Sequence, residues 1–579
     1  MAKRRAQTVQ LPYLIRDRDY LRRSDDPGAL APLLATPLQT HVAVDDGTFR
    51  DGPSNARVAV IDRDPARGEV RPGAAFLARG VGKTVSRYDL GRNELGPESK
   101  PEAFEFDAFF QVSPFATVLK TLDFFEDPQL LGRRVTWAFP SPQLLIVPRA
   151  GVMANAFYER QTNSLEFYYH EAAAGHTVYT ALSHDIVVHE ATHAILDGLA
   201  PDLLDAILPQ SLALHEAIAD LSAISQTLLN EMVVWSIENI SPSGIEAREA
   251  LSRVAEEFGS SRQGESANFL RRLKNTRTLD PNDSGRDEFG TPNRPDPTDL
   301  HALSQVLSGA LYAVFEKRLA ATHRKERNGL PRSLDELVLP AARRVARVTF
   351  RALDYLPPGE VSFADYGRAF LAAAAATYRR PEQEQNWLRE EFVRRGIVES
   401  VAELDVATAS KERLTGIDLS AIVEDEAAAR RFAEDHRELL GLGTVSGFDV
   451  LPRAVASRSL GSKRVEDRRT ELVFRVRWEE GETHDLGWAE PSAWAVPHGT
   501  TLVVEPDSGA VLSCLTTDTS PRRHAERGAM LRRWVVEGKV QEAALGPGER
   551  GPRGAGDKKR AIGRIGRPKG SVRLLHGES

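Results

Sequence analysis

The sequence predicts an α+β protein with short strands first, helices in the middle and a second group of strands near the end. Apolar strand candidates lie at 57–62 and 143–148. Within 106–132, apolar residues recur at helical spacing and predict a buried helix. Alternating runs at 471–478 and 500–515, the second interrupted by a Pro-Asp-Ser-Gly turn, predict β structure with a hairpin. Strands and helices that gather in separate stretches are typical of the α+β class.

Composition limits the kinds of protein this chain can be. Its 579 residues are 41% hydrophobic and 27% charged, which is ordinary for a globular chain of about three domains. The net charge of −7 argues against nucleic-acid binding by the protein as a whole. The one cysteine, Cys514, excludes an intramolecular disulfide and a cysteine-based zinc site. Since no apolar run has the length of a signal peptide or a membrane span, we expect a cytoplasmic protein.

The stretch 183–201 contains His189, Glu190 and His193 in the pattern His-Glu-x-x-His. Residues four apart lie on one face of a helix, so both imidazoles can reach one metal ion. Glu190 then stands beside the first ligand, where it can take a proton from a water molecule. The alternative interpretation is two histidines that border an ordinary core helix.

A second helix is predicted at 212–229, where Glu216 and Asp220 lie four residues apart among Leu, Ala and Ile. Buried carboxylates are costly without partners. Glu216 can complete a His2Glu set of zinc ligands, with one position left to water. Asp220 can accept the other ring N–H of a ligand histidine. The alternative is a solvated helix face.

Upstream, residues 155–159 and 166–170 read as an edge strand and its partner. A strand beside the predicted metal ligands can bind a peptide by backbone pairing. Ordinary sheet residues are the other interpretation of this pair.

Together these stretches resemble the thermolysin family of zinc endopeptidases, which are gluzincins. The resemblance covers roughly 106–397 and includes the segment 296–316, which is similar to the family pattern Asp-x-x-x-x-His-x-x-Ser. It implies a two-lobed metallopeptidase fold, with a β-rich N-terminal lobe and an α-helical C-terminal lobe. The implied activity is hydrolysis of internal bonds in a protein or peptide substrate, with Glu190 as general base. His301 would stabilise the oxyanion, and Asp296 would orient His301.

The resemblance also implies residues that bind substrate. Asn155 and Ala156 would bind its backbone, and Ile186 would line the pocket for the residue after the scissile bond, although core packing explains Ile186 equally well. An arginine shortly before Asp-Pro grips a substrate carbonyl in the family, and Arg277 is the candidate here.

Several positions depart from the family pattern. Asp185 matches one calcium ligand, but Thr227 stands where an acidic ligand is expected, which argues against calcium binding. The connection from His193 to Glu216 contains no tyrosine to act as a second oxyanion donor.

Two alternative functions therefore stay open. One is a zinc aminopeptidase, suggested by the stretch 151–155, although Ala154 replaces the glutamate that would bind a free amine. The other is a catalytically weak scaffold used for protein binding. The sequence does not indicate an oligomeric state.

The remaining segments carry no catalytic pattern. Gly80–Thr84 resembles a phosphate-binding loop but lacks its first glycine, because Leu77 occupies that position. The basic, Gly-rich end is expected to be disordered, and it is the only part that suggests contact with nucleic acid. The expected division is a leader with the β-rich part of the first lobe (1–105), the rest of that lobe with the edge strand and metal-ligand helix (106–200), a helical lobe (201–397), a helical linker (398–442), a small β-rich accessory domain (443–520) and a disordered tail (521–579).

Overall fold

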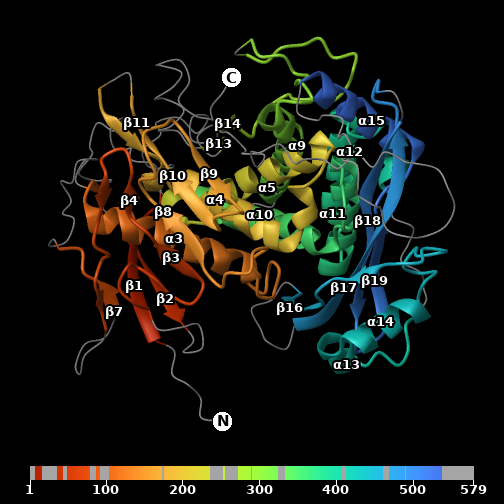
Figure 1. Cartoon of the computed structure of the whole chain (residues 1–579), viewed down its shortest axis with the longest axis horizontal. Helices are drawn as coiled ribbons and strands as arrows, with labels where there is room; N and C mark the ends of the chain where they lie inside the picture. Colours follow the sequence, from red (N-terminus) through yellow and green to blue (C-terminus); the bar gives the residue numbers. More distant parts are fainter. Residues whose placement is uncertain are drawn as a thin grey trace, which may run out of the picture.

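The computed structural model mixes helices and strands, as the α+β prediction requires. Figure 1 shows the N-terminal strands on one side, a group of helices in the centre and the C-terminal sheet on the other side. The structure describes residues 7–15, 35–42, 49–78, 86–91, 104–172, 175–234, 252–254, 271–288, 290–323, 333–405, 413–460, 468–488 and 491–537. The phosphate-loop candidate Gly80–Thr84 lies outside these ranges.

Two four-stranded sheets form the N-terminal part. The first has the order β2-β1-β7-β6 and the second the order β3-β8-β10-β9. In the second sheet β9 pairs antiparallel with β10 and lies at the edge of the described strands, which confirms the predicted edge strand. The partner expected at 166–170 is correct only in part, because β10 ends at Phe167 and Tyr169 and His170 belong to β11 of another sheet. The strand bounds are β1 Gln7–Leu14, β2 Ala35–Val42, β3 Val58–Val60, β4 Arg63–Asp64, β5 Glu69–Val70, β6 Phe76–Leu77, β7 Ser86–Tyr88, β8 Leu144–Val147, β9 Ala156–Glu159, β10 Ser164–Phe167, β11 Tyr169–Glu171, β12 Thr177–Tyr179, β13 Arg253–Val254 and β14 Arg271–Arg272.

Helices fill the centre, and the helix expected within 106–132 is α3. Helix α4 packs against α3 on one side and α5 on another, and α5 packs against α9. The apolar positions of these helices form one continuous core that also includes strands β3, β8 and β10. The helix bounds are α3 Asp107–Glu126, η3 Thr180–Leu182, α4 His184–Leu199, η4 Pro201–Leu203, α5 Pro209–Leu228, α9 Leu300–His323, α10 Leu334–Arg351, η6 Ala352–Tyr355, α11 Phe363–Thr377, α12 Glu382–Arg394 and η7 Val401–Leu404.

The C-terminal part is a five-stranded antiparallel sheet built on two long strands, β17 and β18. The predicted Pro-Asp-Ser-Gly hairpin joins β18 to β19. Helices α13 and α14 share a core with this sheet, where Phe432 of α14 stacks edge-on against Phe474 of β17. Of the stretch expected as a linker, α13 and α14 therefore belong to this domain, whereas Val398 and Leu404 belong to the central core. The bounds are α13 Leu419–Glu424, α14 Glu426–Asp435, β15 Asp449–Val450, β16 Ala454–Ser459, β17 Arg468–His484, β18 Ser492–Glu505, β19 Ala510–Thr516 and α15 Pro521–Val536.

The C-terminal sheet is also joined to the central helices through buried charge. Asp354 in η6 accepts hydrogen bonds from Arg133 at 3.1 Å and from Arg458 of β16. Arg458 donates to Glu471 of β17 at 2.6 Å, and Asp354, Arg458 and Glu471 are all fully buried. Val503 and Leu515 of the sheet belong to the central core. This sheet is consequently an integral part of the fold rather than an appended module.

Helix α15 corrects the prediction that 521–579 is disordered throughout. Its Arg527 pairs with Glu360 at 3.0 Å, and the other oxygen of Glu360 accepts the backbone N–H of Leu208, just before α5 begins. Two further arginines of α15 pair with Asp365 and Asp296. Long-range ion pairs hold this helix, and such partners leave no trace in local composition. Residues 538–579, including the Gly-rich stretch, lie outside the described residues.

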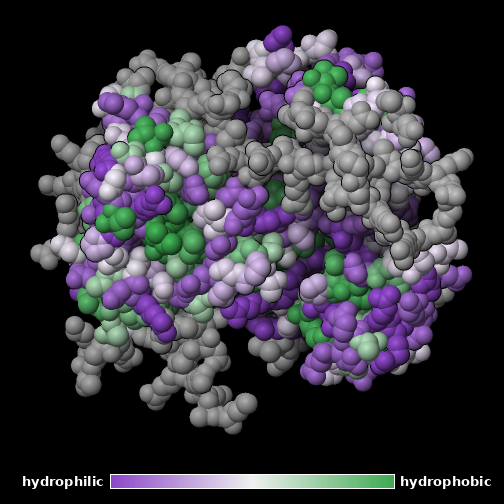
Figure 2. Space-filling view, in the orientation of Figure 1, coloured by the Kyte–Doolittle hydropathy of each residue, from purple (hydrophilic) through white to green (hydrophobic). Residues whose placement is uncertain are grey.

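The surface is mixed in character. On the face that Figure 2 shows, hydrophobic side chains form separate groups among hydrophilic ones, as is usual for folded proteins. Within the described ranges, no helix combines the length and the apolar composition needed to cross a bilayer.

Replacing Asp354 by alanine should leave buried Arg458 without its shared carboxylate and lower the free energy of unfolding by about 3–5 kcal/mol at neutral pH. Burial raises the pKa of Asp354, but Arg133 and Arg458 outweigh burial and lower the pKa to about 2. The stabilisation is therefore complete above about pH 4, the ordinary pKa of an aspartate, and is lost as pH falls towards 2. Denaturant unfolding at several pH values measures both effects.

Glu426→Ala is the control, because that side chain is 69% exposed and its ion pair within the described residues is with Arg453 at the surface. We expect a change below about 1 kcal/mol there. Equal losses in the two variants, or a loss in Asp354→Ala that does not shrink in acid, would contradict the buried network.

Candidate metal centre

Helix α4 carries the predicted His-Glu-x-x-His residues and is held firmly in the core. Its N-cap, Ser183, accepts a hydrogen bond from the backbone N–H of Ile186. In its last turn, Gly198 approaches the carbonyl oxygen of Thr136 so closely that a Cβ atom would lie 1.8 Å from it. Only glycine allows this contact, which fixes how α4 sits against the preceding segment.

Helix α5 begins with Pro209 at its first turn, where proline fits without losing a hydrogen bond. From Ser211 onwards every residue of α5 is buried, including Glu216 and Asp220. The solvated-face alternative for these two carboxylates is thereby wrong.

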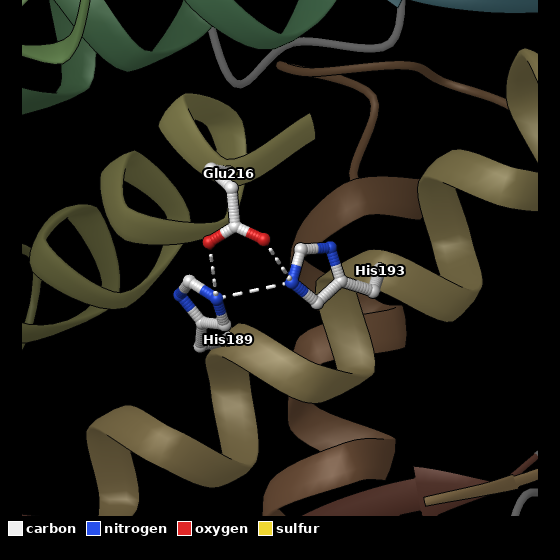
Figure 3. A group of neighbouring side chains, drawn as sticks. All are labelled: His189, His193 and Glu216. Carbon is white, nitrogen blue, oxygen red and sulfur yellow. Dashed lines mark hydrogen bonds and ion pairs between the residues drawn. The ribbon is translucent and has the colours of Figure 1, made fainter. Parts of the chain in front are cut away.

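The two helices bring His189, His193 and Glu216 together (Figure 3). The Nε2 atoms of the histidines are 3.0 Å apart, and each lies 3.3 Å from a different oxygen of Glu216. The imidazole planes are 85° apart, and Figure 3 shows one nitrogen of each ring directed towards Glu216. In a tetrahedral site with bonds of about 2.0–2.2 Å, neighbouring ligand atoms are roughly 3.3–3.6 Å apart. The arrangement could therefore hold one metal ion.

Electrostatics at this point favours a cation. Glu190, Glu216 and Asp220 are at most 1% exposed, and Arg271 is the guanidinium that faces them. Burial lowers the pKa of His189, but its hydrogen bonds with Asp220 and Glu216 outweigh burial and raise it to about 9. Without an ion, the carboxyl groups of Glu190, Glu216 and Asp220 face one arginine and a protonated His189, and a divalent ion would replace that proton as the source of positive charge.

Asp220 lies where the sequence placed it. Its Oδ1 atom is 3.0 Å from Nδ1 of His189, as expected for the acceptor of a ligand's second ring nitrogen. Burial raises the pKa of Asp220, but Arg271 and His189 outweigh burial and keep the pKa below its usual value. Asp220 thus stays a carboxylate and can fix the orientation of the His189 ring.

His301 stands at the start of α9, with Nε2 3.4 Å from Glu216. Its side chain is 27% exposed, whereas the side chains of His189, His193 and Glu216 are nearly inaccessible, so His301 forms the solvent side of the group. Asp296 does not join it: Asp296 accepts hydrogen bonds from Thr298 and pairs with Arg533 at 3.5 Å. Within the described residues, Asp296 therefore does not make the expected contact with His301.

Arg277 also lies apart from the ligand group. Its guanidinium donates to the carbonyl of Pro292 and lies 3.9 Å from Asp287. The arginine at the metal centre is Arg271 of β14, whose Nε is 2.8 Å from Asp220 and whose Nη2 is 3.4 Å from Nδ1 of His189. Of the three arginines at positions 271, 272 and 277, Arg271 is therefore the one that pairs with Asp220, and substrate binding by Arg277 stays a prediction.

Two of the residues predicted to bind substrate, Asn155 and Ala156, are buried at the start of β9. Asn155 uses its side-chain oxygen to accept the backbone N–H of Ala156, and Ala156 is the first residue of the edge strand. Strand β9 packs against α4. Ile186 is 7% exposed and belongs to the central core, which favours its packing interpretation.

At the position considered for calcium, Asp185 is surrounded by groups of this chain. Oδ1 of Asp185 lies 3.3 Å from Nδ1 of His184 and 3.5 Å from the hydroxyl of Thr227. Burial lowers the pKa of nearby Lys120 to about 8, and the charge of Asp185 partly opposes this shift. A lysine beside Asp185 agrees with the argument against calcium there.

A second group of possible ligands, Glu482, His484 and His524, lies between β17 and α15. Its two imidazoles are stacked, with planes 20° apart and centroids at 4.3 Å, so one ion cannot lie near both ring planes. Arg527 also donates to both oxygens of Glu482. This arrangement suits an ion-paired junction better than a metal site.

No family model and no curated protein matches this sequence. The metal centre consequently rests on its own geometry, and the resemblance to the thermolysin family stays a prediction.

We expect the purified protein to bind about one divalent ion per chain with high affinity. His189→Ala and Glu216→Ala should abolish tight binding, and Asp220→Ala should weaken it about 10–100-fold, as for other groups that orient metal ligands. Metal analysis and competition with a chelator measure these changes, with Zn²⁺ as the probe. His436→Ala, on the distant C-terminal domain, is the control. Tight binding that survives in His189→Ala would show that the ion sits elsewhere.

Proposed function

We propose that this chain is a zinc-dependent endopeptidase with a two-lobed, thermolysin-like arrangement of its first 397 residues. The observation that carries the proposal is the convergence of His189, His193 and Glu216. Two imidazoles and one carboxylate are a ligand set typical of catalytic zinc, because the fourth position stays available to water or substrate. The absence of cysteine from the group agrees with a catalytic rather than a structural site.

Zinc, when bound, would acidify a water molecule and polarise the carbonyl of the scissile bond. Glu190 lies on α4 directly after His189 and is 1% exposed, so its carboxylate is shielded from bulk water. In the proposed reaction Glu190 takes a proton from the attacking water as the new C–O bond forms. It then gives that proton to the amine nitrogen as the C–N bond breaks.

His301 is proposed to stabilise the oxyanion. Its Nε2 atom is close to the ligand group and its side chain reaches solvent, so it can meet a substrate that enters from that side. A preorganised donor of this kind typically lowers the barrier by about 3 kcal/mol. Because Asp296 contacts other residues, we assign it no part in orienting His301.

Strand β9 supports an endopeptidase rather than an aminopeptidase. Its outer edge pairs with no described strand, and it packs against the helix that carries His189. An extended peptide could add to this edge by backbone hydrogen bonds that do not require a free amino terminus. Ala154, just before the strand, offers no charge for such a terminus.

Glu190→Gln should retain the metal ion and lose at least about 10²–10⁴-fold in peptide hydrolysis, because an amide cannot accept the proton of the attacking water. The assay uses a library of peptides blocked at the amino terminus, so cleavage also separates endopeptidase from aminopeptidase activity. Glu171→Gln, an exposed carboxylate on β11, is the control. Undiminished cleavage by Glu190→Gln would remove the proposed general base.

We propose that Arg271 binds a carbonyl group of the substrate, the role that the sequence analysis gave to Arg277. We expect Arg271→Met to lower kcat/KM about 10–100-fold, the range for loss of a hydrogen bond from a charged donor. Arg277→Met should change it little, because that guanidinium is already bound to Pro292. Equal effects of the two substitutions on kcat/KM would contradict the reassignment.

A further inference from the structure

His215 precedes Glu216 on α5 and faces the second predicted ligand, His193. The Nδ1 atoms of the two imidazoles are 2.6 Å apart. Their ring planes differ by 23° and their centroids are 4.9 Å apart, so the two nitrogens point at each other within nearly the same plane. Both side chains are at most 1% exposed, which excludes competition from solvent.

One hydrogen atom fits between the two nitrogens. A neutral imidazole has one N–H donor and one lone-pair acceptor, so one of the two rings donates and the other accepts. If His193 uses the lone pair of Nε2 for a metal ion, its hydrogen must lie on Nδ1. His215 must then accept at Nδ1 and carry its own hydrogen on Nε2.

The hydrogen-bond partner of His189 is a carboxylate, whereas that of His193 is an imidazole. Asp220 is a carboxylate that only accepts, so it holds one tautomer of His189 under all conditions where it is charged. His215 can accept or donate, and its Nε2 atom has no hydrogen-bond partner among the described residues. Nothing else in that part of the structure therefore opposes the tautomer that metal binding requires.

We propose that His215 is a positioning residue that holds His193 in the tautomer able to bind the metal ion through Nε2. This inference rests on the proposed zinc centre and extends it to the second histidine. Through a neutral acceptor, His215 orients the ring of His193 without adding a negative charge beside Glu190, Glu216 and Asp220. The site thereby keeps the charge that one divalent ion balances.

The proposal is tested with a matched pair of substitutions at His215. His215→Asn places an acceptor oxygen the same number of bonds from the backbone as Nδ1, whereas His215→Leu has a similar branched shape and no acceptor. We expect Zn²⁺ to bind His215→Leu about 10–100-fold more weakly than wild type and His215→Asn with nearly wild-type affinity. Competition with a chromophoric chelator gives the Kd, and circular dichroism checks the fold.

His215→Ala replaces His215→Leu if the larger apolar side chain does not fold, with the same loss expected. Unchanged zinc affinity in the apolar variant would overturn the proposal, and so would an asparagine variant as weak as the apolar one. A wild-type protein that binds no zinc, or whose zinc survives His189→Ala, would instead refute the metal centre itself. The two failures are therefore distinguishable.

Discussion

The central constraint in this protein is the charge buried between α4 and α5. Apolar residues surround both helices, yet the interface holds Glu190, Glu216 and Asp220, with Arg271 as the guanidinium that faces them. Buried carboxylates that lack enough positive charge are strongly destabilising. A divalent ion between His189, His193 and Glu216 would supply the missing charge and use the donor atoms in their observed positions.

Much of the remaining structure fixes these two helices relative to each other. Helix α4 is held at its last turn by the close approach of Gly198 to Thr136, and α3 packs along its side. The start of α5 is held by Glu360, which is itself paired with Arg527 of the C-terminal helix. The C-terminal sheet, joined through Asp354 and Arg458, thus belongs to the same framework as the metal centre. A rigid framework suits a site whose ligands must lie within a few tenths of an ångström of their working positions.

Local patterns in the sequence predicted those parts of the site that local geometry determines. The four-residue spacing of His189 and His193 fixes a shared helix face, and the same spacing places Asp220 one turn beyond Glu216. The edge strand β9 was expected from the strand-like stretch 155–159 and from the second such stretch that follows it. The position before Asp-Pro led to Arg277, but it does not specify which arginine pairs with Asp220, and in the structure that arginine is Arg271.

The differences between expectation and structure at Asp296 and at α15 share one physical cause, which is long-range pairing. Asp296 contacts Arg533 of α15 rather than His301, and α15 itself is stabilised by partners far away in the sequence. His215 was overlooked although it adjoins Glu216, because a histidine beside a predicted ligand gives no signal unless the opposite helix is known. A buried carboxylate or imidazole on a predicted helix is a reason to search the whole chain for its partner.

The most direct test of the metal centre is a crystal structure of the zinc-loaded protein with anomalous scattering measured at the zinc edge. We predict one strong peak about 2.0–2.2 Å from Nε2 of His189, Nε2 of His193 and an oxygen of Glu216. A peak at any other place, or a Glu216 side chain turned away from both histidines, would contradict this assignment.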